Sequence, residues 1–260
     1  MTDDSLQGTQ VLVRAMRLLA YFTDEQAEWA LKDLSEATGI NRTTAYRLLR
    51  TLESAHYVAQ DPQTGMFRLG SELIILGARA QRANPLHLVS QQVLVYLAHK
   101  TGEMASIEIL EGDKTLILNE VKGEQQRRVG TSIGNMWYAH TTSTGKLLLA
   151  HLPPDARRQL MPTPLPRLTS ATLCDWETLD AELERVYAQG YAIAHDELET
   201  GFCEIAAPVY DYHHSAIAAL SIGGSSARLT PERLPELIQL VRRAAHDVSL
   251  RLGYRMAGGL

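Results

Sequence analysis

A short segment, residues 41–51, carries the residue types that suit contact with DNA. It contains no acidic residue. Arginine can donate to a guanine edge or to phosphates, and threonine suits phosphates and the thymine methyl group. A helix here would turn its polar side chains outward, and Arg68 in a following hairpin would reach the DNA backbone or a minor groove. The alternative is an ordinary solvated helix face. We predict that the DNA-binding residues are Arg42, Thr43, Thr44, Tyr46, Arg47, Arg50 and Arg68.

A second segment, Ser143-Thr-Gly-Lys146, resembles a phosphate-binding loop only in part. Such a loop needs a glycine where His140 stands and a serine or threonine where Leu147 stands. The chain also lacks a nucleophile elbow, a His-Glu-x-x-His zinc motif and a dinucleotide-binding glycine fingerprint after a strand. We therefore expect a protein that is not an enzyme and has no cofactor.

Composition indicates a globular protein of one large domain or two ordinary ones. The chain has 260 residues, 45% of them hydrophobic, and a formal net charge of −5. A local cationic face is enough for specific DNA binding, so this charge does not exclude it. The two cysteines, Cys174 and Cys203, lie far apart and form neither a disulfide framework nor a zinc site. With no signal peptide and no apolar run long enough to span a bilayer, we expect a cytoplasmic protein with no membrane partner.

The first 70 residues have the element order of a winged helix-turn-helix. Apolar residues at helical spacing predict helices over 10–22, 31–38 and 41–54, and two short strands follow over 57–60 and 66–69. Gly39 suits a left-handed helix end, and Asn41 is a good N-cap for the third helix. This order favours DNA binding by the third helix over a solvated face.

The remainder predicts a linker helix and a mixed domain. Residues 71–82 read as a helix, and Asn84-Pro85 indicates a boundary, which gives a DNA-binding domain over 1–70, a linker over 71–84 and a second domain over 85–260. In the second domain we expect a long loop over 153–169 and a final helix that Thr230 and Pro231 open. We expect helices over 86–101, 143–152 and 175–189. We expect strands over 104–110, 115–121, 129–138, 191–195, 205–210 and 216–222. The fold class is α+β with two domains.

Over nearly its whole length the chain resembles the IclR-type regulators. The resemblance rests on Leu31–Glu53, Tyr57-Val58, Phe67–Gly70, Val129-Gly130, Thr144–Ala150, Gly190-Tyr191, Asp196-Glu197, Gly201 and Ile205–Val209. It implies a winged helix-turn-helix and a GAF-like effector-binding domain, assembled as dimers or as dimers of dimers. The implied partners are a double-stranded DNA operator and a small-molecule effector.

The resemblance also places the effector pocket at the start of the segment that begins at Ser143. A helix N-terminus there would offer free backbone N–H groups to an anion. Ordinary packing is the alternative for Trp137 and Ser221. The implied effector-binding residues are Trp137, His140, Ser143, Thr144, Gly145, His195, Glu204 and Ser221.

The sequence departs from the family pattern at this pocket. Ala194 stands where an acidic residue is common, Glu204 replaces a small polar residue, and His214 replaces a turn glycine. Glu204 precedes a strand that should be buried, where a carboxylate is costly unless it is paired or hydrogen-bonded.

Glu204 either faces the pocket, points outward, or is neutralised by Arg127 or Arg128. In the first case the effector would be polar at both ends, as a hydroxylated acid is.

His140, His195 and Glu204 could converge on a cation, but residues so far apart in sequence are weak evidence, and we expect no metal. The function we predict is a DNA-binding transcriptional regulator modulated by a polar organic acid or a related metabolite. Repression and activation, and dimer and tetramer, stay open.

Overall fold

The computed structural model describes residues 9–125 and 132–255. The chain divides into two compact units, residues 1–83 and 84–260. Within the described ranges no helix is long and apolar enough to cross a membrane.

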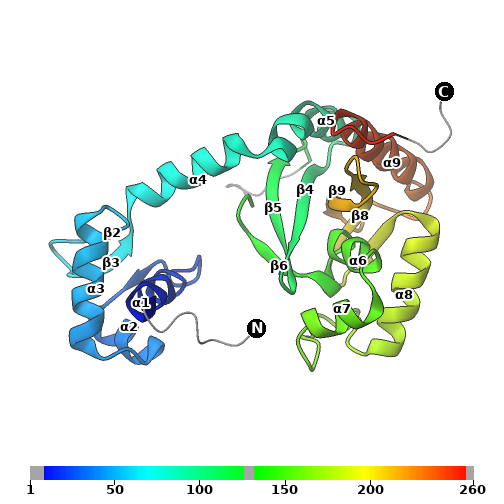
Figure 1. The fold of residues 1–260 in the computed structure, drawn as a ribbon. Coiled ribbons are helices and arrows are strands. Elements are labelled where there is room, and N and C mark those ends of the chain that lie inside the picture. Colours follow the sequence, from blue (N-terminus) through cyan, green and yellow to red (C-terminus); the bar gives the residue numbers. More distant parts are fainter. Residues whose placement is uncertain (1–8, 126–131, 256–260) are drawn as a thin grey trace. The chain divides into compact units, whose positions relative to one another are not determined.

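The first unit is a winged helix-turn-helix followed by one further helix (Figure 1). Its small antiparallel sheet has the strand order β1-β3-β2. The core under it includes Leu34, Leu48 and Phe67. Its elements are α1 (Gln10–Leu19), β1 (Glu28–Trp29), α2 (Leu31–Thr38), α3 (Arg42–Ser54), β2 (Val58–Gln60), β3 (Phe67–Leu69) and α4 (Ser71–Ala83).

Local sequence explains the helix-turn-helix. Gly39 ends α2 with a φ of 68°, a left-handed conformation that glycine adopts without steric cost. Two residues later the side chain of Asn41 accepts a hydrogen bond from the backbone N–H of Thr43 and caps α3. The sequence did not predict the two-residue strand β1, because Glu28 and Trp29 become a strand only by pairing with β3.

The second unit is built on one six-stranded antiparallel sheet of order β6-β5-β4-β9-β8-β7. Its strands are β4 (Met104–Glu111), β5 (Lys114–Val121), β6 (Met136–Tyr138), β7 (Ala192–His195), β8 (Phe202–Tyr210) and β9 (Ala216–Ser225). Its helices are α5 (Pro85–Thr101), α6 (Ser143–Ala150), α7 (Pro154–Leu160), α8 (Trp176–Gln189) and α9 (Leu234–Arg251).

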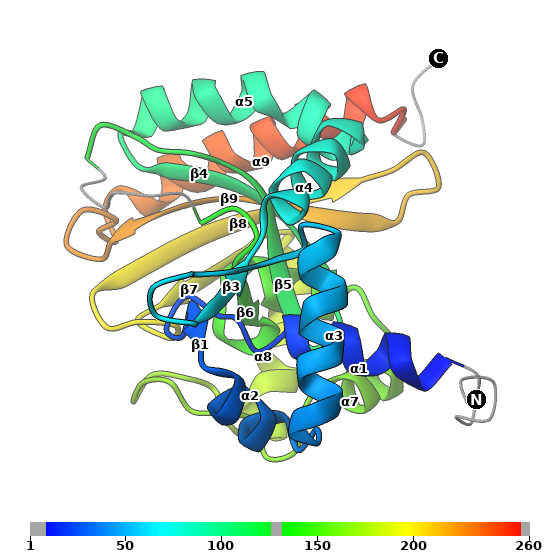
Figure 2. The same ribbon diagram turned by 90° about the vertical axis from the view of Figure 1, so that its left-hand side faces the viewer.

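Helices cover both faces of this sheet. The long helices α5 and α9 lie side by side over one face (Figure 2), and an apolar core joins them to the strands. On the other face α6 packs against β8 and β9, with α8 behind it, around a second core that includes Leu147 and Leu183. A residue near the middle of these strands is therefore buried whichever way its side chain points.

Several boundaries differ from the expected ones. Strand β8 begins at Phe202 rather than at residue 205, so Glu204 lies within the strand and not before it. The expected loop after residue 153 contains α7, where Pro154 lies in the first turn and its missing N–H costs nothing. The last helix begins at Leu234 rather than at Thr230, because the Thr230 carbonyl closes a separate turn by accepting from Arg233 N and Leu234 N. Of the strand expected over 129–138, Met136–Tyr138 forms β6, and residues 129–131 lie outside the described residues. The predicted α+β fold with a winged helix-turn-helix is otherwise confirmed.

Candidate effector site and DNA-binding surface

The outer face of α3 carries the residues predicted to contact DNA. Ala45, Leu48 and Leu49 are buried in the core of the first unit, so the remaining positions face solvent. All but Thr44, which is partly buried, are exposed: Arg42, Thr43, Tyr46, Arg47 and Arg50. The helix therefore presents a cationic, hydroxyl-bearing surface of the kind that enters a major groove.

The two outermost arginines of this surface differ in their surroundings. Arg50 forms an ion pair with Glu53 one turn further along α3. Arg68 is exposed in β3, where it pairs with Ala59 on one side and Glu28 on the other. Arg42 and Arg47 have no ion pair among the described residues, so their guanidinium groups are available to DNA.

In the second unit, the start of α6 is occupied by a carboxylate of the chain itself. Glu204 Oε2 accepts hydrogen bonds from Ser143 N at 3.0 Å and from Ser143 Oγ at 2.8 Å. The amide of Gly145 is also used, because it donates to the side chain of Thr142, which caps the helix. The expectation that these amides are free for an anion is therefore wrong: Glu204 fills that position.

A second buried carboxylate, that of Glu108 on β4, lies in the same hydrogen-bond network. Thr144 donates to Glu108 Oε2 at 2.7 Å, and Ser106 Oγ lies 3.0 Å from Glu108 Oε1. Ser106 Oγ also lies 2.9 Å from Ser221 Oγ, and Ser221 Oγ lies 3.0 Å from Glu204 Oε1. The two carboxyl groups are thus joined through two serine hydroxyls.

The contacts in this chain of four oxygens bear on its protonation. If all three contacts from Glu108 through Ser106 and Ser221 to Glu204 are hydrogen bonds, they use three hydrogens, and the two hydroxyls supply two. A proton on one of the carboxyl groups would complete the set. Burial, reinforced by the charge of Glu204, raises the pKa of Glu108 to about 8. Burial likewise raises the pKa of Glu204, against the hydrogen bonds from Ser143 and Ser221.

The structure thus brings together part of the implied site. Ser143, Thr144, Glu204 and Ser221 belong to this network, which we call the carboxyl pair site together with Glu108 and Ser106. Of the alternatives for Glu204, an outward orientation is excluded because the side chain is buried. Neutralisation by Arg127 or Arg128 concerns residues outside the described ranges.

The other expected residues surround α6 without entering this network. Gly145 is required by close packing, since a Cβ there would lie 2.1 Å from the carbonyl oxygen of Ala139. His140 is buried, with Nε2 2.8 Å from the carbonyl oxygen of Pro166, and burial lowers its pKa. Trp137 pairs with Thr115 in the neighbouring strand and is partly exposed.

His195 lies apart from the carboxyl pair site. It pairs with Cys203 on β8, and paired residues of antiparallel strands point to the same face of a sheet. Cys203 belongs to the core under α5 and α9, whereas Glu204, one residue on, points to the α6 face. The His195 side chain is over half exposed and lies 3.4 Å from Asp196. Strand alternation therefore separates His195 from Glu204.

Sequence reasoning missed Glu108 and Ser106. A glutamate that alternates with Ile107 and Ile109 in a strand is usually taken to face solvent. One signal in the sequence could have found them. The second domain has enough predicted helices to cover both faces of its sheet, and a sheet covered on both faces buries every central position. Recognising that cover would have made Glu108 a buried charge that needs partners.

Lys146, which follows the carboxyl pair site on α6, has a different role. Its side chain is 1% exposed, and its ammonium group lies 2.6 Å from Glu197, 3.3 Å from Glu182 and 2.7 Å from the carbonyl oxygen of Ile193. These partners leave it no role toward a phosphate. Nor do the described residues include a group of three or more His, Cys, Asp or Glu side chains that could hold a metal ion.

Two family models match most of the chain. Residues 11–62 match the IclR helix-turn-helix domain, and residues 80–250 match the C-terminal domain of the bacterial transcriptional regulator IclR. The chain belongs to the IclR family of bacterial transcriptional regulators. It is therefore a regulator with a DNA-binding helix-turn-helix and not an enzyme.

Individual relatives cover most of the chain. The transcriptional repressor AllR of Klebsiella pneumoniae is 30% identical over 250 residues, which are 96% of this chain and 92% of AllR. A solved IclR regulator from Alicyclobacillus acidocaldarius is 26% identical with a TM-score of 0.83, covering 93% of this chain and 98% of that one. An IclR homologue from Microbacterium hydrocarbonoxydans, solved with 4-hydroxybenzoate, is 24% identical with a TM-score of 0.81, covering 94% and 99%.

Proposed function

We propose that this IclR-family regulator binds operator DNA through α3 and Arg68, and that a small-molecule effector at the carboxyl pair site controls the binding. The observation that carries the proposal is the buried pair Glu108 and Glu204, held by hydroxyls at the start of α6. Buried carboxyl groups are costly to folding, and such groups are concentrated at functional sites. Because the relatives include the repressor AllR, we propose repression that the effector relieves.

Arg42 and Arg47 are the residues we assign to the operator. Each is exposed on α3 and forms no ion pair with another residue that the structure describes. If Arg47 contacts a base, Arg47→Ala should weaken operator binding by about 1–3 kcal/mol and relax discrimination at one base pair.

Gel-shift titration on the DNA upstream of the protein's own gene tests this assignment. Lys100→Ala is the control, since it removes one positive charge from an exposed position on α5. If Arg42→Ala, Thr44→Ala and Arg47→Ala all bind the operator with unchanged affinity, α3 is not the recognition helix.

The chemistry of the carboxyl pair site favours an effector with hydroxyl groups. Glu204 already occupies the amide of Ser143, so a simple carboxylate would meet a like charge there. Hydroxyls can donate to Glu108 and Glu204 in place of the serines, and an acid group would lie at the other end of the effector. By binding one arrangement of the protein more tightly than another, the effector would shift the population that binds DNA.

Thermal shifts with matched acids test this effector class. Lactate, malate and gluconate are paired with propionate, succinate and hexanoate, which lack the hydroxyls. We expect a rise in melting temperature with at least one hydroxylated acid and none with its partner, since a bound ligand stabilises the folded state by mass action.

Glu204→Ala should abolish the thermal shift and leave ligand-free operator affinity nearly unchanged. Cys203→Ala, one residue away on the opposite face, should keep the thermal shift. If Glu204→Ala loses folding or operator binding while its ligand response persists, Glu204 is structural and the effector site lies elsewhere.

Self-association is the third part of the proposal. Large apolar side chains are exposed on two helices of the first unit: Val11, Leu12 and Met16 on α1, and Ile74, Ile75 and Leu76 on α4. Exposed apolar patches of this kind indicate a protein interface, and two-fold symmetry would pair operator half-sites. We expect light scattering to show a dimer or tetramer and Ile74→Glu to weaken it; a wild-type monomer at micromolar concentration would contradict this.

A further inference from the structure

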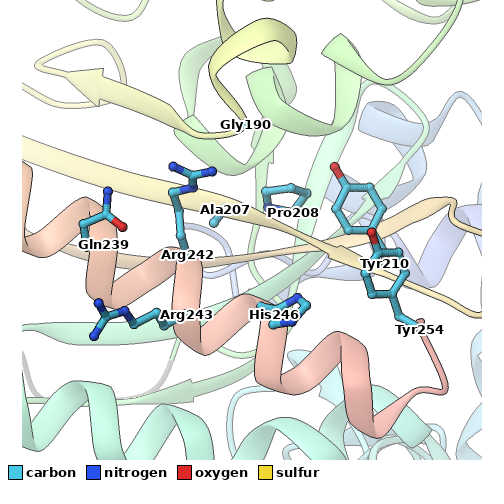
Figure 3. Close-up of a pocket in the computed structure, with 9 residues that line it drawn as sticks. All are labelled: Gly190, Ala207, Pro208, Tyr210, Gln239, Arg242, Arg243, His246 and Tyr254. Carbon is cyan, nitrogen blue, oxygen red and sulfur yellow. The ribbon is translucent and has the colours of Figure 1, made fainter. Parts of the chain in front are cut away.

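A cavity of about 400 Å³ lies at the edge of the sheet beside β8 and α9 (Figure 3). It has a size typical of small-molecule pockets, about 300–1,000 Å³. Its floor includes Ala207, which belongs to the core under α5 and α9, the face opposite to Glu204. The cavity is therefore separate from the carboxyl pair site. It is lined by Gly190, Ala207, Pro208, Tyr210, Gln239, Arg242, Arg243, His246 and Tyr254.

The ends of two neighbouring elements create this cavity. Strand β7 begins at Ala192, opposite Ala206, so β8 has no β7 partner beyond that point. Gly190 ends α8 in a left-handed conformation with a φ of 70°, just before β7. Pro208 lies on the edge left uncovered and has no backbone N–H to offer another strand. A ligand can therefore reach this edge of β8, whereas another strand cannot pair with it at Pro208.

One end of the cavity is cationic. Gln239, Arg242, Arg243 and His246 follow one another at i, i+3, i+4 and i+7 on α9, so they share one side of the helix. Arg242 points towards Gly190 across the cavity (Figure 3). Within the described part of the chain, neither Arg242 nor Arg243 forms an ion pair, and no acidic residue lines the cavity. The Arg243 guanidinium points away from that of Arg242 (Figure 3), so Arg242 is the cation that faces Gly190, and a guanidinium without a carboxylate partner favours an anion.

The other end is aromatic. Tyr210 and Tyr254 are stacked with their ring centroids 5.3 Å apart and an interplanar angle of 25°. The Tyr210 hydroxyl lies 3.1 Å from His151 Nε2, which fixes its ring. The His246 ring packs edge-on against Tyr254 at 6.0 Å, between the tyrosines and the arginines. An apolar ring placed here would meet ring faces and the flat side of Pro208.

We propose that this cavity binds a planar organic anion, with its aromatic ring against Tyr210 and Tyr254 and its carboxylate or phosphate group at Arg242. The site is independent of the effector response proposed above, because it lies at the edge of the sheet and shares no residue with the carboxyl pair site.

Calorimetric titration of the full chain with benzoate and phenyl phosphate tests the site. We expect both to bind, whereas benzylamine and acetate, which lack the anion or the ring, should not. Arg242→Ala should weaken binding about tenfold or more, since a hydrogen bond to a charged group contributes about 1.5–3 kcal/mol. Arg242 is exposed, so this variant should melt like the wild type.

Two control variants locate the binding. Lys100→Ala removes a charge elsewhere, and Ser221→Ala changes the carboxyl pair site; both should bind benzoate as the wild type does. Benzoate binding that is lost in Ser221→Ala but kept in Arg242→Ala would assign the ligand to the carboxyl pair site and overturn the proposal. Absence of binding by both probes, or binding unaffected by Arg242→Ala, would also overturn it.

Discussion

The two faces of the six-stranded sheet carry different kinds of side chain, although the same strands supply both. Towards α5 and α9 the strands present Ala105, Ile107, Leu220 and other apolar residues in one continuous core. Towards α6 the neighbouring positions of those strands are Ser106, Glu108 and Ser221, all buried. Alternation along a strand, one residue at a time, thus gives the sheet an apolar face towards α5 and α9 and a mixed face towards α6, where these polar residues lie beside Ala192, Ala206 and Ala219 of the second core. We call the second one the polar face.

The difference indicates which face stabilises the fold and which face is the better candidate for the ligand recognition proposed above. Apolar burial stabilises the protein without further requirements. Buried carboxyl groups oppose folding unless hydrogen bonds satisfy them, and here hydroxyls of β4, β9 and α6 do so. A sheet could be packed more simply with apolar residues on both faces, so the polar face is where selection for function is expected.

The largest expected effect concerns the buried ammonium of Lys146 on the polar side. Lys146→Met leaves Glu197 buried without its partner, and breaking a buried pair costs about 3–5 kcal/mol of unfolding free energy. Urea denaturation measures this loss. Adding Glu197→Gln to the variant should recover part of it, because the unpaired charge is then gone; a double variant as unstable as the sum of both changes would contradict the pairing.

A similar loss is expected on the apolar face from Leu220→Ala. Leu220 is fully buried in the core under α5 and α9, and such truncations cost about 2–5 kcal/mol. The comparison predicts that this variant, once folded at low temperature, keeps the wild-type response to hydroxylated acids. A changed ligand preference in Leu220→Ala would show that the two faces are not separate in function.

A smaller, pH-dependent effect is expected from Glu108→Gln. The pKa of Glu108 rises from 4.5 to about 8 in the folded protein, so the folded state keeps a proton that the unfolded state releases. The corresponding stability is fully present below pH 4.5 and is lost as the pH rises through about 8. Glutamine does not titrate, so the variant should gain on the wild type between pH 5 and pH 9. Urea denaturation of both proteins across that range measures the difference, and parallel pH profiles would contradict a protonated Glu108.

The sequence predicted the DNA-binding unit better than the effector site, for physical reasons. Gly39 and Asn41 act on their own neighbours, so their roles can be read locally. The partners of Glu204 come from α6 and β9, and their hydrogen bonds depend on sheet register and helix cover. Because sheet register and helix cover could not be read from the sequence, His195 was predicted to lie near Glu204 and Glu108 was not predicted to be buried. Local signals predicted the elements, whereas contacts between elements decided the site.

The start of α6 binds a carboxylate, which Glu204 supplies. Removing that group with Glu204→Ala leaves Ser143 N, Ser143 Oγ and Ser221 without their acceptor. Added acetate can take its place, so acetate at constant ionic strength should raise the melting temperature of Glu204→Ala with increasing concentration. The wild type should show no such rise with acetate. Nor should Leu220→Ala, a variant that creates a cavity on the apolar face. Equal responses in all three proteins, or no response in Glu204→Ala, would contradict the account.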